Sequence, residues 1–243
     1  MTHAARPALL AALAASLLAG CGSGGPRSEG NRLFLGGPWT DRDREEVLRA
    51  APSRVVAAEL AFARLAQEKG QWTAFLETST DDAVMFVPQP VNAHDWLRRQ
   101  TNPPEAVKWQ PHQVWSSCDG TLAVTKGAWQ RPDGTVGYFT TVWERQRDGK
   151  YKWVMDQGDE LAQPLEAPEF VEATAADCRP QTPNAMPAMS AIGASDKMNQ
   201  GQSRDGTLRW HVVTHPDGSR DVDVSYWDGT AWQDALREEV AAE

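Results

Sequence analysis

The stretch that decides the fold runs from Trp109 to Glu160 and reads WQPHQVWSSCDGTLAVTKGAWQRPDGTVGYFTTVWERQRDGKYKWVMDQGDE. Asp-Gly pairs at 119–120, 133–134 and 148–149 separate runs rich in β-branched and aromatic residues. Glycine accepts the positive φ that a tight hairpin turn needs, and aspartate tolerates it. The pattern therefore predicts an antiparallel meander of four strands, over Trp109–Ser117, Thr121–Gln130, Thr135–Arg147 and Lys150–Gln157.

Both faces of the third predicted strand carry bulky side chains. Tyr138 and Val142 point to one face, and Phe139 and Trp143 point to the other. We therefore expect helices to cover one face of the sheet and a curled sheet to enclose part of the other.

Helical patterns precede the meander. A helix over Ser53–Lys69 has an apolar stripe and ends at Gly70, a residue typical of the position after a helix. A short helix over Gln71–Glu77, a buried strand over Ala83–Val87 and a third helix over Ala93–Gln100 follow. The fold class is therefore α+β.

This order of elements resembles the NTF2-like superfamily, which includes SnoaL-like and DUF4440-type domains. The segment AELAFARLAQEKGQWTAFLETSTDDAVMFVPQPV at Ala58–Val91 resembles the opening of DUF4440-type domains, and YKWVMDQGDE at Tyr151–Glu160 resembles their closing strand. The resemblance implies an NTF2-like cone over 39–160, with a curved antiparallel sheet wrapped around N-terminal helices and a pocket between them. Members include isomerases, cyclases, dehydratases and non-catalytic binding modules, so the fold does not fix the function.

The remainder of the chain after the meander divides into two parts. Residues 161–206 are rich in proline and alanine and are interpreted as a linker or a strap on the sheet. Residues 207–236 predict a small C-terminal β-meander of hairpins, followed by a charged tail. Because about thirty residues bury little surface alone, we expect this unit to dock on the main domain or on a partner.

The N-terminus has the pattern of an export signal over 1–20, with Arg6 before a short apolar run. Leu18-Ala19-Gly20-Cys21 resembles the bacterial lipobox, which implies a lipid on Cys21 and a flexible tether over 21–38. The alternative is an ordinary signal peptide with an incidental cysteine. Because Gly22 follows the cysteine, lipoprotein sorting rules favour the outer membrane, on the periplasmic side of the cell envelope, over the inner membrane.

Charge and motifs exclude several classes of function. Removal of residues 1–20 takes away Arg6 alone among the charged residues and leaves a net charge of 23 − 33 = −10, which argues against a nucleic-acid partner. The sequence has no phosphate-cradling glycine loop and no His-x-x-Glu-His motif. We therefore expect no metal and no cofactor.

Cys118 and Cys178 remain once Cys21 carries lipid. In an oxidising compartment we expect a disulfide between them, and the alternative is two unpaired buried thiols.

Candidate site residues lie on the predicted strands. Asp156, if buried, has the raised pKa that a general base needs near neutrality. The resemblance to NTF2-like isomerases implies a partner that holds the developing oxyanion, and Tyr138 is the candidate, with His112 assisting proton transfer. Trp129 and Phe62 are candidates for ligand contact. Each has a structural alternative: turn acceptor for Asp156, water contact for Tyr138, an exposed edge for His112, and ordinary core for the two aromatic residues.

Two hypotheses of different class follow. The favoured one is a lipid-anchored, non-catalytic module that binds a small apolar ligand or a protein partner. The rival is a small-molecule isomerase, cyclase or dehydratase with Asp156 as general base. Convergence of Asp156, Tyr138 and His112 in an enclosed cavity would favour the enzyme. A third alternative is a scaffold that forms a homodimer through sheets that pair face to face.

Overall fold

The computed structural model describes residues 49–179 and 192–242. The predicted export signal, the tether and the lipidation site Cys21 lie outside these ranges. Within them, no helix combines the length and the apolar character that a membrane span requires.

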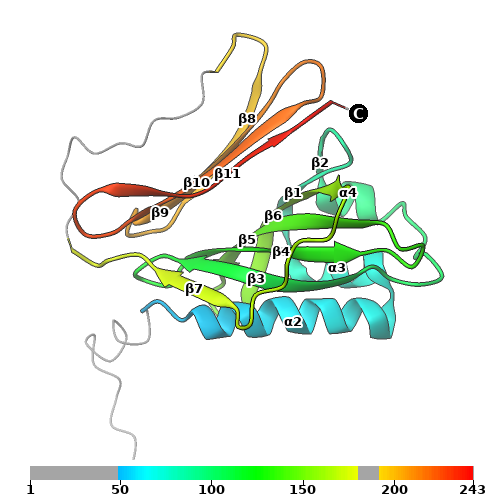
Figure 1. Cartoon of the computed structure of the whole chain (residues 1–243), viewed down its shortest axis with the longest axis horizontal. Helices are drawn as coiled ribbons and strands as arrows, with labels where there is room; N and C mark the ends of the chain where they lie inside the picture. Colours follow the sequence, from blue (N-terminus) through cyan, green and yellow to red (C-terminus); the bar gives the residue numbers. More distant parts are fainter. Residues whose placement is uncertain (1–48, 180–191, 243) are drawn as a thin grey trace, which may run out of the picture. The chain divides into compact units, whose positions relative to one another are not determined.

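The described chain is α+β, with its helices in the first half (Figure 1). They are α2 (Pro52–Lys69), α3 (Gln71–Thr78) and α4 (Ala93–Leu97). Helix α2 begins with a proline in its first turn and ends at Gly70, whose φ of 98° suits glycine. The sequence predicted the start of this helix to within one residue.

A seven-stranded sheet holds the predicted meander at its centre, in the order β2-β1-β6-β5-β4-β3-β7. Its strands are β1 (Ser79–Phe86), β2 (Pro90–Asn92), β3 (Lys108–Ser116), β4 (Leu122–Gln130), β5 (Val136–Arg145), β6 (Tyr151–Leu161) and β7 (Glu172–Ala175). The sheet is mixed rather than antiparallel, because β1 pairs parallel with β6 and β7 pairs parallel with β3. Both parallel pairs join strands that are distant in sequence, as parallel pairing requires.

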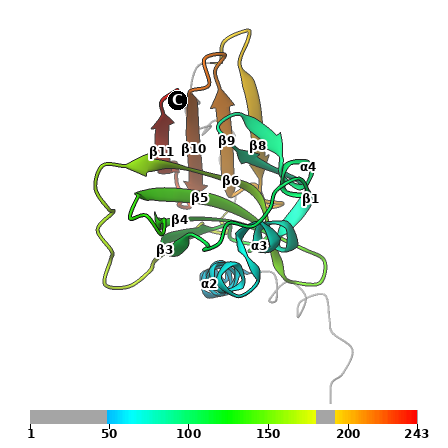
Figure 2. The ribbon, with the colours of Figure 1, turned by 90° about the vertical axis from the view of Figure 1, so that its right-hand side faces the viewer.

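Helices cover one face of this sheet. Val55, Phe62 and Ala66 of α2 pack with Trp143 and Trp153 of the sheet in one apolar cluster. Figures 1 and 2 show α2 and α3 on the same side of the strands.

A second, four-stranded sheet covers the other face, in the order β11-β10-β9-β8 (Figure 2). Its strands are β8 (Lys197–Gln202), β9 (Leu208–Thr214), β10 (Arg220–Trp227) and β11 (Trp232–Val240). Leu208, Val212 and Val222 pack there against Val124 and Val142. The C-terminal strands thus dock on the main sheet, and a separate sheet, not a curl of the first, encloses the second face.

Strands also occur where the sequence indicated a linker and a tail. Strands β7 and β8 lie inside 161–206, and their short, polar sequences gave no apolar alternation. Strand β11 continues to Val240, beyond the predicted end at 236, because Leu236, Glu238 and Val240 alternate inward and are all buried.

Candidate functional site

A cavity of about 610 Å³ lies between the helices and the main sheet. Aromatic side chains from α3, β3, β4 and β5 supply most of its apolar wall: Trp72, Phe75, Trp109, Trp129 and Phe139. The volume is within the range of pockets for small organic molecules.

Glycines in the sheet make room for two of these rings. Phe139 pairs with Gly127 on one side and with Gly158 on the other. A Cβ at Gly127 would lie 2.7 Å from the Phe139 ring, and a Cβ at Gly137 would lie 2.2 Å from the Trp129 ring. Only glycine permits so close an approach, so these positions let both rings lie over the strands and line the cavity.

Asp156 is the deepest carboxyl group in the cavity wall. It lies on β6, and Thr141 Oγ1 donates a hydrogen bond of 2.7 Å to its Oδ1. Burial raises the pKa of Asp156 to about 7; the Thr141 hydrogen bond opposes this rise and the nearby Glu59 adds to it. The side chain keeps partial exposure through the cavity. Near neutral pH it can therefore accept or release a proton in contact with a ligand.

Glu59 is a second buried carboxyl group, and the sequence analysis missed it. It has no exposed surface, and it accepts hydrogen bonds from Trp109 Nε1 (2.8 Å), Trp143 Nε1 (3.1 Å) and Thr125 Oγ1 (2.6 Å). Burial raises its pKa, and the three hydrogen bonds act in the opposite direction. Its position four residues after Val55 and three before Phe62, on the apolar stripe of α2, was the available signal.

Tyr138 and His112, the tentative catalytic partners of Asp156, do not join it in the cavity, so the convergence that would favour the enzyme is not present. Tyr138 lies under the ammonium group of Lys126, 5.1 Å from the ring centre, on the face toward the second sheet. Burial, followed by the charge of Glu238, raises the pKa of Tyr138. His112 is the extra residue in a bulge of β3, and burial lowers its pKa. Neither residue lines the cavity.

Trp129 and Phe62 both line the cavity, as the sequence indicated. Trp129 Nε1 donates to the Tyr138 carbonyl at 2.8 Å, which fixes the indole across β5. Phe62 packs edge-to-face against Phe75 and Trp109, with ring centres 4.7 Å and 4.8 Å away. Phe62 is therefore a core residue that also lines the cavity, whereas Trp129 is half-buried and lies outside the core cluster.

A serine, a histidine and an aspartate also meet near α4. Ser79 Oγ lies 2.9 Å from His94 Nε2, and His94 Nδ1 lies 3.6 Å from Asp81 Oδ1. However, Ser79 has no exposed surface, and its hydroxyl also donates to the Leu76 carbonyl at 3.2 Å. A nucleophile must reach its substrate, so the buried contact between Ser79 and His94 is a structural link, whereas the Asp81 side chain is exposed.

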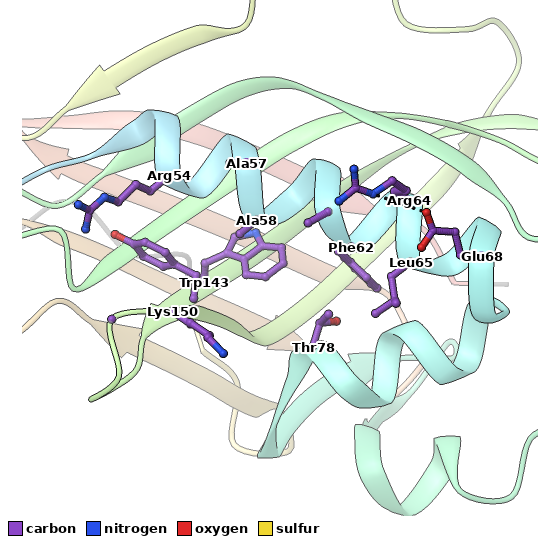
Figure 3. Close-up of a pocket in the computed structure, with 13 residues that line it drawn as sticks. Arg54, Ala57, Ala58, Phe62, Arg64, Leu65, Glu68, Thr78, Trp143 and Lys150 are labelled. Atoms are coloured by element: carbon purple, nitrogen blue, oxygen red, sulfur yellow. Dashed lines mark ion pairs between the residues drawn. The ribbon is translucent and has the colours of Figure 1, made fainter. Parts of the chain in front are cut away.

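A second hollow of about 520 Å³ lies along α2 beside the β5–β6 turn (Figure 3). Its walls carry Arg54, Arg64 and Lys150, and Arg64 pairs with Glu68 at 3.8 Å. Trp143, which also contributes to this hollow, is 1% exposed. The hollow therefore carries mainly basic charged side chains, whereas the larger cavity carries an excess of acidic ones.

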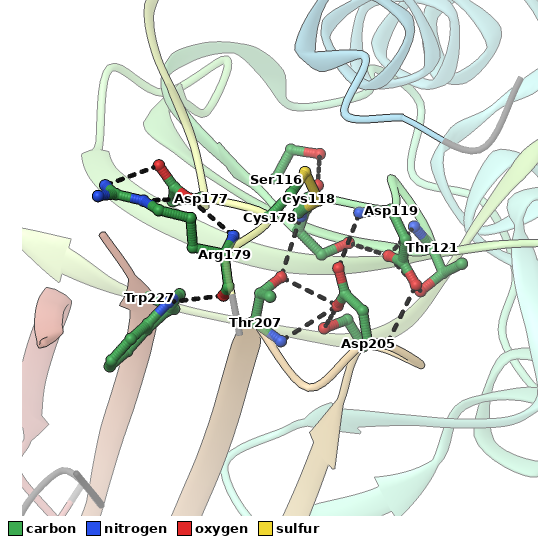
Figure 4. The surroundings of a disulfide bond; sticks show 12 residues. Ser116, Cys118, Asp119, Thr121, Asp177, Cys178, Arg179, Asp205, Thr207 and Trp227 are labelled. Atoms are coloured by element: carbon green, nitrogen blue, oxygen red, sulfur yellow. Dashed lines mark hydrogen bonds and ion pairs between the residues drawn. A yellow bond between two sulfur atoms is a disulfide. The ribbon is translucent and has the colours of Figure 1, made fainter. Parts of the chain in front are cut away.

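The predicted disulfide between Cys118 and Cys178 is present (Figure 4). It closes a loop of 60 residues and joins the β3–β4 turn to the chain that follows β7. A loop of this length corresponds to about 4 kcal/mol of stabilisation in the chain-entropy account.

The turn that carries Cys118 has a sequence counterpart in the second sheet. Ser117–Leu122 reads SCDGTL and Ser203–Leu208 reads SRDGTL. The two turns contact each other reciprocally: the Asp119 N–H donates to the Asp205 carboxylate at 2.9 Å, and the Asp205 N–H donates to the Asp119 carboxylate at 3.1 Å (Figure 4). This pair of equivalent turns fastens the two sheets together at one end.

Among residues 49–179 and 192–242, no group of three or more His, Cys, Asp or Glu side chains is arranged to hold a metal ion.

No protein-family model matches the sequence, and no match was found among curated proteins. Solved structures are similar over about half of the chain. A Parabacteroides distasonis protein, provisionally assigned as a ketosteroid isomerase, is 14% identical with a TM-score of 0.37, over 48% of this chain and 97% of its own.

Two further structures show the same partial similarity. An NTF2-like protein of unknown function from Methylobacillus flagellatus is 13% identical with a TM-score of 0.35, over 45% of this chain and 91% of its own. The CaMKII hub of S. rosetta is 17% identical with a TM-score of 0.35, over 46% and 98%. The similar structures thus include NTF2-like proteins, the superfamily that the sequence resembles. Similarity at this level says nothing about function.

Proposed function

We propose that residues 39–160 form an NTF2-like domain whose cavity binds a small, mainly apolar organic molecule. The supporting observation is the aromatic cavity of about 610 Å³ with one carboxyl group, Asp156, deep in its wall. Apolar lining with a few convergent polar groups is typical of small-molecule sites.

Binding is favoured over catalysis because three of the polar donors in the wall already have protein acceptors. Trp109 Nε1 donates to Glu59, Trp129 Nε1 donates to a backbone carbonyl, and Thr141 donates to Asp156. Removal of a proton next to a carbonyl needs a donor that stabilises the developing oxyanion. Tyr138 and His112, the candidates for that role, lie outside the cavity.

Calorimetric titration with 2-naphthylmethanol tests the binding proposal. We expect one bound molecule per chain, and we expect Val107→Trp, which fills the cavity, to weaken binding at least tenfold. Ala61→Trp adds the same side chain to the basic hollow and is the matched control. Absence of binding, or equal affinity in the two variants, contradicts the proposal.

The rival function is proton transfer on a small ketone, and the pKa of Asp156 near 7 favours it. Proton NMR of 2-tetralone in deuterated buffer follows exchange at the carbons next to the carbonyl. Exchange that the protein accelerates and that Asp156→Asn abolishes supports an enzyme. If the wild type and Asp156→Asn give the same exchange rate, the enzyme hypothesis fails and only the binding function is supported.

The proposal places the domain in the bacterial cell envelope, tethered by a lipid on Cys21 and preferentially at the outer membrane. The lipobox-like Leu18–Cys21 supports this location, and so does the disulfide, which is typical of oxidising compartments. Cys21→Ser should move the protein from the membrane fraction to the soluble fraction. Unchanged fractionation contradicts lipidation.

We also propose that a homodimer or a complex with a protein partner can form, but through fewer surfaces than the sequence suggested. The sheet face expected for a homodimer is covered by β8–β11 of the same chain. A homodimer or a protein partner would therefore use another surface, and light scattering measures the oligomeric state.

A further inference from the structure

We infer that the cavity selects an organic cation, in which an apolar body lies on the aromatic walls and an ammonium group pairs with Asp156. This inference rests on the proposed binding function and names the class of ligand. Three observations support the inference: the charge of the cavity wall, its aromatic lining and the placement of its two guanidinium groups.

The cavity wall carries more acid than base. Four carboxyl groups line it against two guanidinium groups: Glu105, Asp156, Asp159 and Glu160 against Arg131 and Arg220. In a chamber with low-dielectric walls, such an excess raises the local concentration of cations and disfavours anions.

Both guanidinium groups are held by the protein itself. Arg131 forms an ion pair with Glu160 and lies over the Trp129 ring, 4.7 Å from its centre. Arg220, which comes from β10, donates to Gln157 Oε1 at 3.1 Å and to the Gly158 carbonyl at 2.7 Å. Each guanidinium group thus already has at least one protein acceptor, and the two are not paired as a clamp for an anionic ligand.

The aromatic walls suit a cation as well as an apolar body. Trp72, Phe75 and Trp109 form a continuous set, with ring centres 5.6 Å apart for the first pair and 5.9 Å for the second. The electron-rich faces of such rings attract ammonium groups, most strongly where water is excluded. A carboxylate beside aromatic rings therefore offers a cation two attractive contacts, whereas an alcohol gains only a hydrogen bond.

An anionic ligand would meet repulsion. Asp156 lies close enough to Glu59 for the two charges to interact, and a third negative charge in the same interior would add to this repulsion. A cation instead offsets the charge of Asp156. Cation binding should therefore strengthen as pH rises through the pKa of Asp156, near 7.

The charged groups around Asp156 set this pH dependence together. They are Glu59 from α2, Glu105 from the loop before β3, Arg131 after β4, Asp159 and Glu160 from β6, and Arg220 from β10. Burial raises the pKa of both Asp156 and Glu59, and of these two only Asp156 lines the cavity, with a pKa of about 7. Its ionisation should therefore act most directly on a ligand.

Three probes of similar size test the inference by calorimetry at pH 8: 2-naphthylmethylammonium, 2-naphthylmethanol and 2-naphthoate. We expect the ammonium compound to bind at least tenfold more tightly than the alcohol, and the carboxylate to bind most weakly. Asp156→Asn should reduce the ratio of ammonium to alcohol affinity to near one. Asp159→Asn, a matched change nearer the end of β6, should reduce the ratio less.

The outcomes separate the inference from the proposed function. If the alcohol or the carboxylate binds most tightly, the cation inference fails and the binding function stands. A ratio that is unchanged in Asp156→Asn, or unchanged between pH 5 and pH 8, also overturns the inference. If none of the three probes binds, the proposed function itself fails.

Discussion

The two faces of the seven-stranded sheet each bury carboxylate side chains, but they treat them differently. Toward the second sheet, Glu238 forms an ion pair with Lys126 at 2.8 Å and accepts hydrogen bonds from Thr140 and Gln157. Toward the helices, Glu59 and Asp156 form no ion pair with the described residues and are held by neutral donors.

The contrast supports the proposal that the face beneath the helices is the functional one. A buried carboxylate without a cation costs free energy, which a neighbouring cation partly offsets. Between the two sheets, Lys126 supplies the compensating cation, so the polar contacts there stabilise the docking of the sheets. Beneath the helices no such cation compensates Glu59 and Asp156. The free-energy cost of burying these carboxylates therefore remains at the face that also contains the cavity. Stability given up at a cavity wall is typical of functional sites.

Asp156→Asn should give the largest difference between the faces. A carboxyl group with a raised folded-state pKa holds a proton that the unfolded chain has lost, so its contribution to the unfolding free energy falls as pH rises from about 4 to about 7. The pKa change from 3.8 to about 7 corresponds to an upper limit of about 4 kcal/mol. The variant should match the wild type at pH 4 and exceed its stability by up to this amount at pH 8.

Urea unfolding at several pH values measures this difference. Asp148→Asn, at the exposed β5–β6 turn, is the control and should show no such pH-dependent gain. If Asp156→Asn parallels the wild type from pH 4 to pH 8, the carboxyl group is not destabilised by burial, and the contrast between the faces is lost.

Lys126→Met should give the next largest effect, because it leaves Glu238 buried without its cation. The loss in unfolding free energy should be about 3 kcal/mol, at the low end for buried pairs because the lysine is one quarter exposed. Adding Glu238→Leu should recover most of that loss, as measured by urea unfolding. A single variant as stable as wild type would show that water, not Lys126, compensates Glu238.

Much of this arrangement could be predicted from the sequence, but the pairing of faces could not. Asp-Gly turns defined β3 to β6, and the apolar stripe defined α2. Alternation separated Tyr138 from Thr141 on β5, but it could not say which of them faces Asp156. That depends on register, and the register between β5 and β6 shifts at a bulge near Trp153.

The burial of charged side chains also could not be predicted from the sequence. Glu59 and Glu238 occupy inward positions of a helix and a strand, where a charged residue usually indicates a solvent-facing side. Their partners, Trp109 and Thr125 for Glu59 and Lys126 for Glu238, lie 50 or more residues away. Such long-range hydrogen bonds leave no local pattern, so among the buried carboxyl groups the sequence analysis identified Asp156 but neither Glu59 nor Glu238.

Paired threonine substitutions compare the faces more finely. Thr125→Val keeps the shape of the side chain but removes a donor to Glu59, which has only neutral partners, and should cost about 2 kcal/mol. Thr140→Val removes a donor to Glu238, which keeps Lys126 and Gln157, and should cost about 1 kcal/mol. Thermal unfolding ranks the stability of the two variants. Equal losses of stability would mean that Lys126 does not reduce the dependence of Glu238 on its hydrogen bond from Thr140.

Arg131→Met should give the smallest effect, because its ion pair with Glu160 lies at the exposed end of the cavity wall. The arginine and glutamate side chains are 44% and 57% exposed, and exposed pairs contribute less than about 1 kcal/mol. Loss of the stacking on Trp129 adds a comparably small term. The change should act mainly on ligand binding, because it frees Glu160 and makes the cavity more acidic. Affinity for 2-naphthylmethylammonium should therefore rise about threefold while the midpoint of thermal unfolding moves by only a few degrees. A large loss of stability would show that the Arg131–Glu160 pair stabilises the cavity wall as strongly as Lys126 stabilises the packing of the two sheets. Both faces would then depend on ion pairs, and the contrast between a face with a compensating cation and a face without one would be lost.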